Sequence, residues 1–227
     1  MSAQGSPLSA HETLLRELAV QAIRRLDALG LNRGSTGNLS HRCARGGVEG
    51  MLITPTGMGA EELRAQDMVW VGVNGSVQGD WEPSSEWHFH QAVLARRADL
   101  QAVVHTHSVH ATALACLERA LPPFHYMVAV AGTDTVPCTP YHVFGSEALS
   151  QAVAQALSDR DACLMAHHGL VAAGSTLAQA MKVAIEIESL CEVYLKVLAV
   201  AEPAPLSAEQ MAEVLDKFSR YGRSRRR

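Results

Sequence analysis

Two short stretches organise this chain: Pro83-Ser84-Ser85-Glu86-Trp87-His88, and His105-Thr106-His107 about twenty residues later. In the first stretch, two hydroxyls and a carboxylate stand where a helix is predicted to begin. The second stretch closes a Val- and Ala-rich run that starts at Gln101 and predicts a buried strand. We therefore expect the functional side chains to gather where this helix begins and this strand ends.

The two histidines of the second stretch have the spacing of a metal site. Residues i and i+2 of a strand point to the same face, so His105 and His107 could bind one ion together. A second pair, His167-His168, follows another predicted buried strand and precedes Gly169. One of this pair could complete a set of three neutral imidazoles, which leaves a metal such as Zn²⁺ a position for substrate or a carboxylate. Taken alone, each motif is more typical of ordinary polar residues at a strand end than of a metal site.

Several short polar segments could bind an anion. The N–H groups and the dipole at a helix N-terminus favour a phosphate beside Ser84 and Ser85, although these serines could simply cap the helix. The turns Gly37-Asn38 and Thr56-Gly57 could bring backbone N–H groups to the same anion, or they could be ordinary loops. Beside a metal, Glu86 could bind the ion or move a proton. A metal next to a phosphate-binding site suggests chemistry on a sugar phosphate.

Composition places the chain among globular proteins of a reducing compartment. The 227 residues are 48% hydrophobic and 19% charged, with a net charge of −4 that gives no nucleic-acid footprint. Five cysteines without a Cys-x-x-Cys pair argue against a disulfide framework. Without a signal pattern or an apolar run of about 18 residues, we expect a soluble cytoplasmic protein with no membrane partner. We expect one domain over 1–227, with 222–227 as a flexible basic tail.

Hydrophobic periodicity and turn residues predict mixed secondary structure. Helices are expected at 10–29, 60–66, from Ser84-Ser85-Glu86 to about 97, and at 109–118, 146–157, 177–200 and 208–220. Strands are expected at 39–42, 50–53, 68–73, 76–79, 101–106, 135–139, 162–166 and 170–173, with Asn74-Gly75 as a type I′ hairpin turn. Some strands are joined by hairpins and others are followed by helices. This mixture predicts an α/β domain with a largely antiparallel or mixed sheet covered by helices.

Six motifs, in this order, resemble the class II aldolase/adducin-head family. They are Gly37-Asn38-Leu39-Ser40, Ile53-Thr54-Pro55-Thr56-Gly57, Pro83-Ser84-Ser85-Glu86, His105-Thr106-His107, His125-Tyr126-Met127 and His167-His168-Gly169-Leu170. The resemblance covers nearly the whole chain, from about residue 8 to residue 222. Each motif is modest by itself, but six in order with compatible spacing are specific.

The resemblance implies a fold, an assembly and a cofactor. The fold would be a three-layer α/β/α sandwich around a mostly antiparallel sheet, and the protein a four-fold symmetric homotetramer with active sites at subunit interfaces. Zn²⁺ would be held by His105, His107 and His168, with Glu86 as a fourth ligand that leaves when substrate binds. Other divalent ions could take its place.

The resemblance also implies roles for further residues. Phosphate would sit on Gly37, Asn38, Thr56, Gly57, Ser84 and Ser85. Tyr126 would reach a neighbouring subunit's site and act on the aldehyde. Phe144, Phe218 and Tyr221 would match the family's aldehyde-side residues.

The implied reaction is the reversible aldol cleavage of a ketose 1-phosphate to dihydroxyacetone phosphate and a small aldehyde. Glu86 would exchange the proton at the enediolate carbon, and Tyr126 the proton of the aldehyde oxygen, without a lysine Schiff base. Alternatives within the family are a pentulose 5-phosphate epimerase and a sugar-acid phosphate decarboxylase or dehydratase. A non-enzymatic module like the adducin head and a metal-dependent hydrolase of unrelated fold also remain. The aldehyde-side matches favour the aldolase.

Overall fold

One eight-stranded sheet organises the residues that the computed structural model describes, 9–220. The strand order is β4-β3-β2-β1-β5-β8-β7-β6, and every neighbouring pair is antiparallel except β6 and β7. The strands are β1 (Asn38–Arg42), β2 (Gly50–Ile53), β3 (Val69–Gly72), β4 (Val77–Gln78), β5 (Ala102–Thr106), β6 (Cys138–Thr139), β7 (Ala162–Met165) and β8 (Gly169–Gly174). The prediction of a mostly antiparallel sheet in an α/β fold is confirmed.

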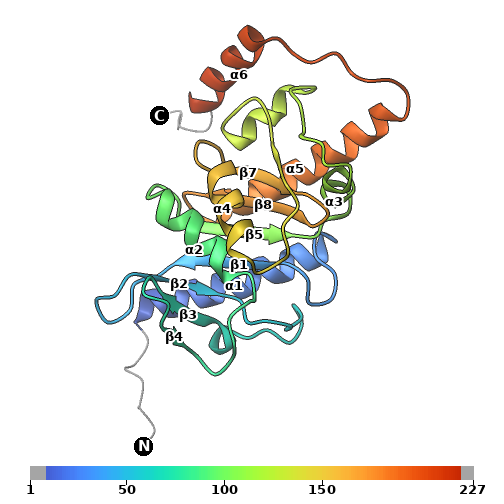
Figure 1. Ribbon diagram of the computed structural model, residues 1–227. Coiled ribbons are helices and arrows are strands. Elements are labelled where there is room, and N and C mark those ends of the chain that lie inside the picture. The colour runs from blue at the N-terminus through green and yellow to red at the C-terminus, as the bar shows by residue number, and fades with distance from the viewer. Residues whose placement is uncertain (1–8, 221–227) are drawn as a thin grey trace, which may run out of the picture.

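Helices cover both faces of this sheet (Figure 1). They are α1 (Ala10–Ala28), α2 (Trp87–Arg96), α3 (Val109–Cys116), α4 (Glu147–Ala156), α5 (Leu177–Leu198) and α6 (Ala208–Arg220), with 3₁₀ turns η1 (Ala65–Asp67) and η2 (Tyr126–Ala131). Successive strand residues point to opposite faces, so Val104 packs with α1, α3 and α5 while its neighbour Val103 packs with α2 and α4. Apart from the exposed edge strand β4, the sheet is therefore buried on both sides, and most of its polar side chains lie at strand ends.

Helix α1 is fixed to the sheet by a buried ion pair. The Ser9 hydroxyl caps α1 by accepting from the N–H of Glu12 at 3.0 Å. The Glu12 carboxylate does not return this bond. It pairs with Arg16 at 2.7 Å, and Arg16 donates to the carbonyl of Met68 at 2.7 Å. Ser9 thus caps the helix without a return bond from Glu12, and Arg16 ties the helix to the segment before β3.

Three local predictions are wrong. Instead of a helix at 60–66 the chain forms only η1, because the Asp67 carboxylate accepts from the N–H of Arg64 at 2.9 Å and closes a single short turn. Asn74-Gly75 is not a type I′ turn, since Asn74 lacks a positive φ and its side chain instead accepts from the N–H of Ser76 at 3.1 Å. The strand predicted at 135–139 shrinks to β6, because Pro137 has no N–H to donate to a ladder.

The sequence did not reveal η2, which begins after His125 and ends at Gly132. Helix α6 packs against η2 at one end of the molecule, after an extended segment that follows α5 (Figure 1). Helix α6 begins with a capping box: Gln210 N–H donates to the Ser207 hydroxyl at 3.2 Å, and Ser207 N–H donates to the Gln210 side chain at 2.8 Å. None of the helices described within residues 9–220 is long and apolar enough to cross a bilayer.

Candidate active site

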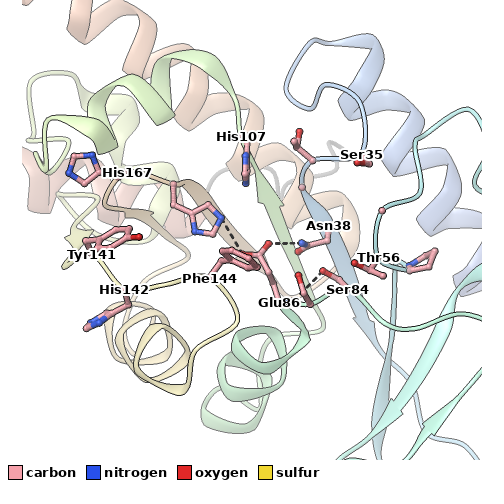
Figure 2. Close-up of a pocket in the computed structure, with 16 residues that line it drawn as sticks. Ser35, Asn38, Thr56, Ser84, Glu86, His107, Tyr141, His142, Phe144 and His167 are labelled. Carbon is pink, nitrogen blue, oxygen red and sulfur yellow. Dashed lines mark hydrogen bonds and ion pairs between the residues drawn. The ribbon is translucent and has the colours of Figure 1, made fainter.

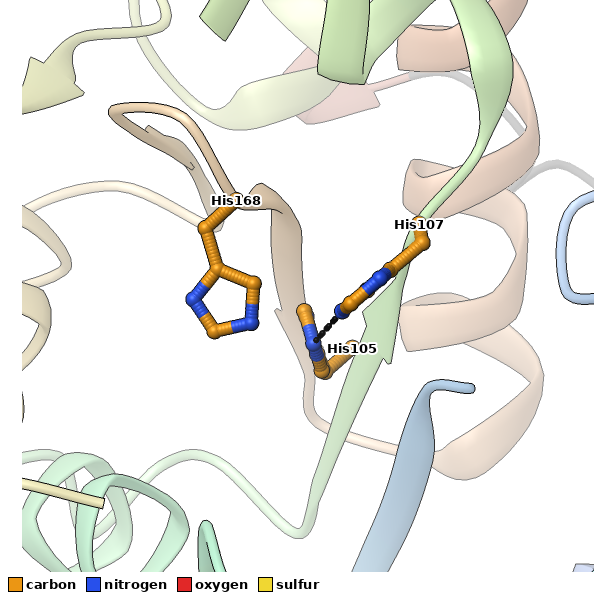
Figure 3. Close-up of side chains that lie close together, drawn as sticks. All are labelled: His105, His107 and His168. Carbon is orange, nitrogen blue, oxygen red and sulfur yellow. Dashed lines mark hydrogen bonds between the residues drawn. The ribbon is translucent and has the colours of Figure 1, made fainter. Parts of the chain in front are cut away.

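Three histidines converge where β5 ends and the β7–β8 turn begins. Residues Thr106 and Leu170 face each other across β5 and β8, and this register brings His168 beside His105 and His107. One ligand nitrogen from each ring lies within 4.8 Å of the other two. Figure 3 shows the three rings facing one another around a common point, with the Nε2 atoms of His105 and His107 3.0 Å apart. This is the predicted three-histidine cluster, and His168 rather than His167 supplies its third member.

Hydrogen bonding and burial prepare these rings to bind a cation. The Nδ1 atom of His105 lies 2.9 Å from the carbonyl oxygen of Leu170, which can only accept. The proton therefore sits on Nδ1, and the lone pair of Nε2 faces the cluster. Burial, together with the charges of His105 and His168, lowers the pKa of His107 to about 4. Neutral imidazole is the form that binds a metal.

Glu86 lies directly under the cluster. It occupies the N-cap position of α2 but makes no side-chain capping bond. Its Oε2 is 3.2 Å from His105 Nε2, and its Oε1 is 3.1 Å from His168 Nε2. Burial alone would raise the pKa of Glu86, but its interactions with the adjacent His105 and His168 rings outweigh burial and lower the pKa below its ordinary value. At neutral pH the group is a carboxylate.

The donor set fits a divalent cation. Glu86 Oε1 is buried and makes no hydrogen bond, since its approach to His168 has the distance of an ion pair without hydrogen-bond geometry. Three imidazole rings and an unpartnered carboxylate oxygen are therefore gathered around one point. Uncompensated lone pairs of this kind, buried together, are satisfied by a metal ion.

All six residues expected around the phosphate line one cavity of about 330 Å³ next to this cluster (Figure 2). They are Gly37, Asn38, Thr56, Gly57, Ser84 and Ser85. The turns require glycine at one of these positions: Gly37 has a φ of 73°, and a Cβ there would lie 2.4 Å from the Asn32 side chain. Turns far apart in sequence thus form the wall of the cavity that faces the histidines.

The hydroxyls and the amide in this wall are not equivalent. The Ser84 hydroxyl accepts from the N–H of Glu86 at 3.3 Å and is buried, whereas Ser85 is exposed to the cavity. The side chain of Asn38 points toward Glu86 and donates to its Oε2 at 2.8 Å. The free donors in this wall are therefore Ser85, Thr56 and backbone N–H groups.

The residues expected on the aldehyde side divide into two groups. Phe144 lines the histidine cavity and is 66% exposed. Tyr126 and Phe218 line a different cavity of about 660 Å³, together with Lys182 and Lys217. Within one chain the structure does not bring these two side chains to the histidines. Tyr221 lies outside the described residues.

The cavity also contains side chains that the sequence did not single out. Ser35 lies on the phosphate side, and Tyr141 and His142 lie on the side of Phe144 (Figure 2); Thr36 also lines the cavity. His167, the histidine expected to point away from the metal, lines the cavity mouth and lies 2.9 Å from Glu118. Tyr141 and His142 carry no pattern beyond their closeness to Phe144 in sequence.

His167 and Glu118 are also unusual in their backbone. They have φ values of 55° and 52° and are the only non-glycine residues between 9 and 220 with a positive φ. Left-handed backbone in such residues is strained and is concentrated at functional sites. Part of this strain therefore lies in the turn that carries His168, next to His167.

Comparisons with known proteins agree with this geometry. The family model "Class II Aldolase and Adducin N-terminal domain" matches residues 17–195. The 5-methylthioribulose-1-phosphate/5-deoxyribulose-1-phosphate aldolase of Rhodospirillum rubrum is 47% identical over 92% of this chain and 92% of its own. The L-fuculose phosphate aldolase of Escherichia coli strain K12 is 47% identical over 86% of this chain and 89% of its own.

A solved structure supports the same assignment. An L-fuculose 1-phosphate aldolase superimposes with a TM-score of 0.87 at 32% identity, covering 96% of this chain and 100% of the other. A family model over most of the chain, two relatives near one-half identity and this superposition all agree. The chain belongs to the class II aldolase and adducin N-terminal domain family.

Proposed function

We propose that this protein is a zinc-dependent aldolase that reversibly cleaves a ketose 1-phosphate to dihydroxyacetone phosphate and a small aldehyde. The observation that carries the proposal is one cavity with two unlike walls. His107, His168 and Glu86 form one wall, and the donor-rich turns around Ser85 and Thr56 form the other. A three-carbon phosphate fits between a cation that would bind its carbonyl oxygen and turns that would bind its phosphate.

The metal has one role in this scheme. Zn²⁺ held by His105, His107 and His168 would act as a Lewis acid on the substrate carbonyl and stabilise the negative charge that develops during carbon–carbon cleavage. Another divalent ion could supply the same chemistry. The remaining work falls to side chains of the protein.

Two side chains would move the protons. In the cleavage direction a base removes the proton of the C4 hydroxyl, the C3–C4 bond breaks to release the aldehyde, and an acid returns a proton to C3 of the resulting enediolate. We assign the proton transfer at C3 to Glu86, because its carboxylate lies at the histidine cluster and lines the cavity. We assign the proton transfer at the C4 hydroxyl to Tyr126 of a neighbouring subunit.

The assignment of Tyr126 makes the site composite. Tyr126 is 50% exposed and lies in a separate cavity of its own chain, so it can serve the reaction only in a second copy's site. A composite site requires an assembly, and on the family resemblance we propose that it is a homotetramer in the cytoplasm, with Phe144 on the aldehyde side of each site and Phe218 and Tyr221 contributed beside Tyr126. We also propose that residues 1–227 form one domain, whose two helical layers and sheet make the three-layer α/β/α sandwich.

For the substrate we propose L-fuculose 1-phosphate, which yields L-lactaldehyde, because an L-fuculose phosphate aldolase is 47% identical to this chain and an L-fuculose 1-phosphate aldolase superimposes on it with a TM-score of 0.87. A 5-deoxypentulose 1-phosphate or its 5-methylthio analogue is the second candidate. The Rhodospirillum rubrum relative of that name is equally identical to this chain and aligns over more of it. Both candidates share the dihydroxyacetone phosphate half and differ only in the aldehyde.

The test is a comparison of substrates with purified protein. L-Fuculose 1-phosphate, 5-deoxyribulose 1-phosphate and 5-methylthioribulose 1-phosphate are offered separately, and dihydroxyacetone phosphate is measured with a coupled dehydrogenase. L-Ribulose 5-phosphate serves as the epimerase control. We expect release from at least one ketose 1-phosphate, with the largest kcat/KM for L-fuculose 1-phosphate. Epimerisation of the control without release from any 1-phosphate would show that the reaction has been assigned wrongly.

A further inference from the structure

A line of hydrogen-bonded side chains runs from the middle of the sheet to Glu86. Ser40 Oγ lies 2.8 Å from His90 Nδ1, and His90 Nε2 lies 2.5 Å from Asn38 Oδ1. Asn38 Nδ2 donates to Glu86 Oε2 at 2.8 Å. Ser40 and Asn38 come from the same face of β1, and His90 comes from α2. Ser40 and His90 are 0% exposed, and Asn38 and Glu86 are 5% and 6% exposed.

The chemistry of the groups sets the direction of every bond in this line. A carboxylate can only accept, so Asn38 must turn its NH₂ group toward Glu86 and its oxygen toward His90. That oxygen can only accept, so the proton of His90 sits on Nε2. Burial, with a smaller effect from the charge of His105, lowers the pKa of His90 to about 3. The ring is therefore neutral, and its bare Nδ1 accepts from the Ser40 hydroxyl.

This line makes the two oxygens of Glu86 unequal. Oε2 is held by Asn38, whereas Oε1 is buried without a hydrogen-bond partner and lies toward His168. Leaving a buried acceptor unpaired is unfavourable and in native proteins calls for an explanation such as catalysis or a bound ion. A carboxylate anchored through one oxygen presents the other in a fixed direction.

We propose that Ser40, His90 and Asn38 are positioning residues that hold Glu86 through Oε2, so that Oε1 is the atom that exchanges the C3 proton of the substrate. The inference rests on the proposed function, in which Glu86 handles that proton. It reassigns the side chain of Asn38 from the phosphate to the proton-transfer step. Ser40 and His90, which do not line the cavity, become part of the catalytic apparatus without touching substrate.

The proposal separates proton transfer from binding, and this difference can be measured. Metal-loaded protein is incubated with dihydroxyacetone phosphate in D₂O without aldehyde, and NMR follows deuterium entering C3. Because misplacement of a reacting group by about 1 Å can slow a step about 10²-fold, we expect His90→Phe to exchange about 10- to 10²-fold more slowly. Affinity for dihydroxyacetone phosphate and metal content should stay within about twofold of wild type, since no binding group is removed.

Milder variants and a matched control distinguish the predicted effect from misfolding of His90→Phe. Ser40→Ala removes only the far end of the line and should slow exchange by a smaller factor, about threefold to tenfold. His90→Gln, which keeps a donor toward Asn38, should restore part of the rate lost in His90→Phe. His88→Phe is the same substitution two residues earlier on the exposed side of α2 and should exchange at the wild-type rate.

A second measurement does not depend on turnover. In zinc-loaded protein with ¹⁵N-labelled histidine, the His90 ring should show the Nε2–H tautomer, and Asn38→Leu should abolish this preference. Normal exchange in folded His90→Phe and Ser40→Ala, or an Nδ1–H tautomer of His90 in wild type, would overturn the proposal. Absence of exchange in wild-type protein would instead count against the proposed function. The tautomer of His90 would still show whether the hydrogen bonds from Ser40 to Glu86 run in the proposed direction.

Discussion

At the scale of single residues, the two neighbouring serines before α2 have different tasks. Ser84 is buried and its hydroxyl accepts from the N–H of Glu86, so it shapes the start of the helix. Ser85 is exposed to the cavity, and the structure gives its hydroxyl no protein partner among the described residues. Ser85 is therefore the hydroxyl in this pair that is free to bind a phosphate.

We predict that Ser85→Ala raises KM for a phosphorylated substrate by about 10-fold or more and leaves kcat nearly unchanged. A hydrogen bond to a charged group contributes about 1.5–3 kcal/mol, and this bond would form equally in ground state and transition state. Steady-state kinetics with dihydroxyacetone phosphate and an aldehyde measure the change. Unphosphorylated dihydroxyacetone is the control, and an equal loss with that substrate would remove Ser85 from the phosphate site.

At the scale of elements, the site depends on the close approach of β5 and β8. A Cβ on Gly169 would lie 2.4 Å from the carbonyl oxygen of Thr106. That carbonyl is backbone and cannot move aside as a flexible side chain can. The absence of a side chain at Gly169 thus lets the His168 turn close on the end of β5.

We predict that Gly169→Ala destabilises the fold by about 1–3 kcal/mol, the usual effect of overpacking, and weakens metal binding as well. Urea denaturation and metal content after dialysis measure the two effects. Gly59→Ala is the matched control, because a Cβ there would meet nothing closer than 3.7 Å. Unchanged stability and metal content in Gly169→Ala would show that the strands can separate without harm to the site.

The elements also show what the sequence could and could not predict. Apolar runs that end in histidine indicated where β5 and β7 end, because burial and strand periodicity are local properties of the chain. The prediction of a helix at 60–66 was wrong because the Asp67 side chain accepts a hydrogen bond from the backbone N–H of Arg64 and closes a shorter turn. The turn η2 was missed because its apolar residues form one short run without helical spacing.

The role of Asn38 shows the same limit inside the site. Its partners Glu86 and His90 lie 48 and 52 positions away in sequence, and only the docking of α2 on β1 brings them together. Sequence motifs placed Asn38 in a phosphate turn, and it does line that cavity. The orientation of its amide depends on tertiary packing and could not be predicted from the motif.

At the scale of the whole molecule, one chain does not contain every group that the proposed reaction needs. Tyr126 belongs to η2 and Phe218 to α6, and both line a cavity separate from the one lined by His107 and Glu86. A closed assembly with identical interfaces would bring each Tyr126 to a neighbour's cavity. This arrangement makes the activity a property of the assembly.

We predict that two inactive variants complement each other. His107→Ala lacks a metal ligand and Tyr126→Phe lacks the group proposed to move the C4 hydroxyl proton, so each alone should be inactive or nearly so. When both are co-expressed with different tags and the mixed assembly is purified, a site with its own His107 and a neighbour's Tyr126 should occur in about a quarter of positions. Activity near that fraction is expected. Verified mixed assemblies without recovered activity would show that Tyr126 does not act across an interface.

We propose that His105, His107, His168 and Glu86 hold one divalent ion and that no aldol cleavage occurs without this ion. The most direct measurement is a zinc titration of chelator-treated protein, with dihydroxyacetone phosphate release from L-fuculose 1-phosphate, or from the better substrate of the panel, as the readout. We predict no release from metal-free protein and a linear rise that saturates at about one equivalent of Zn²⁺ per chain, with no rise in His107→Ala. Full release from metal-free protein, or full activity of metal-depleted His107→Ala, would contradict the account.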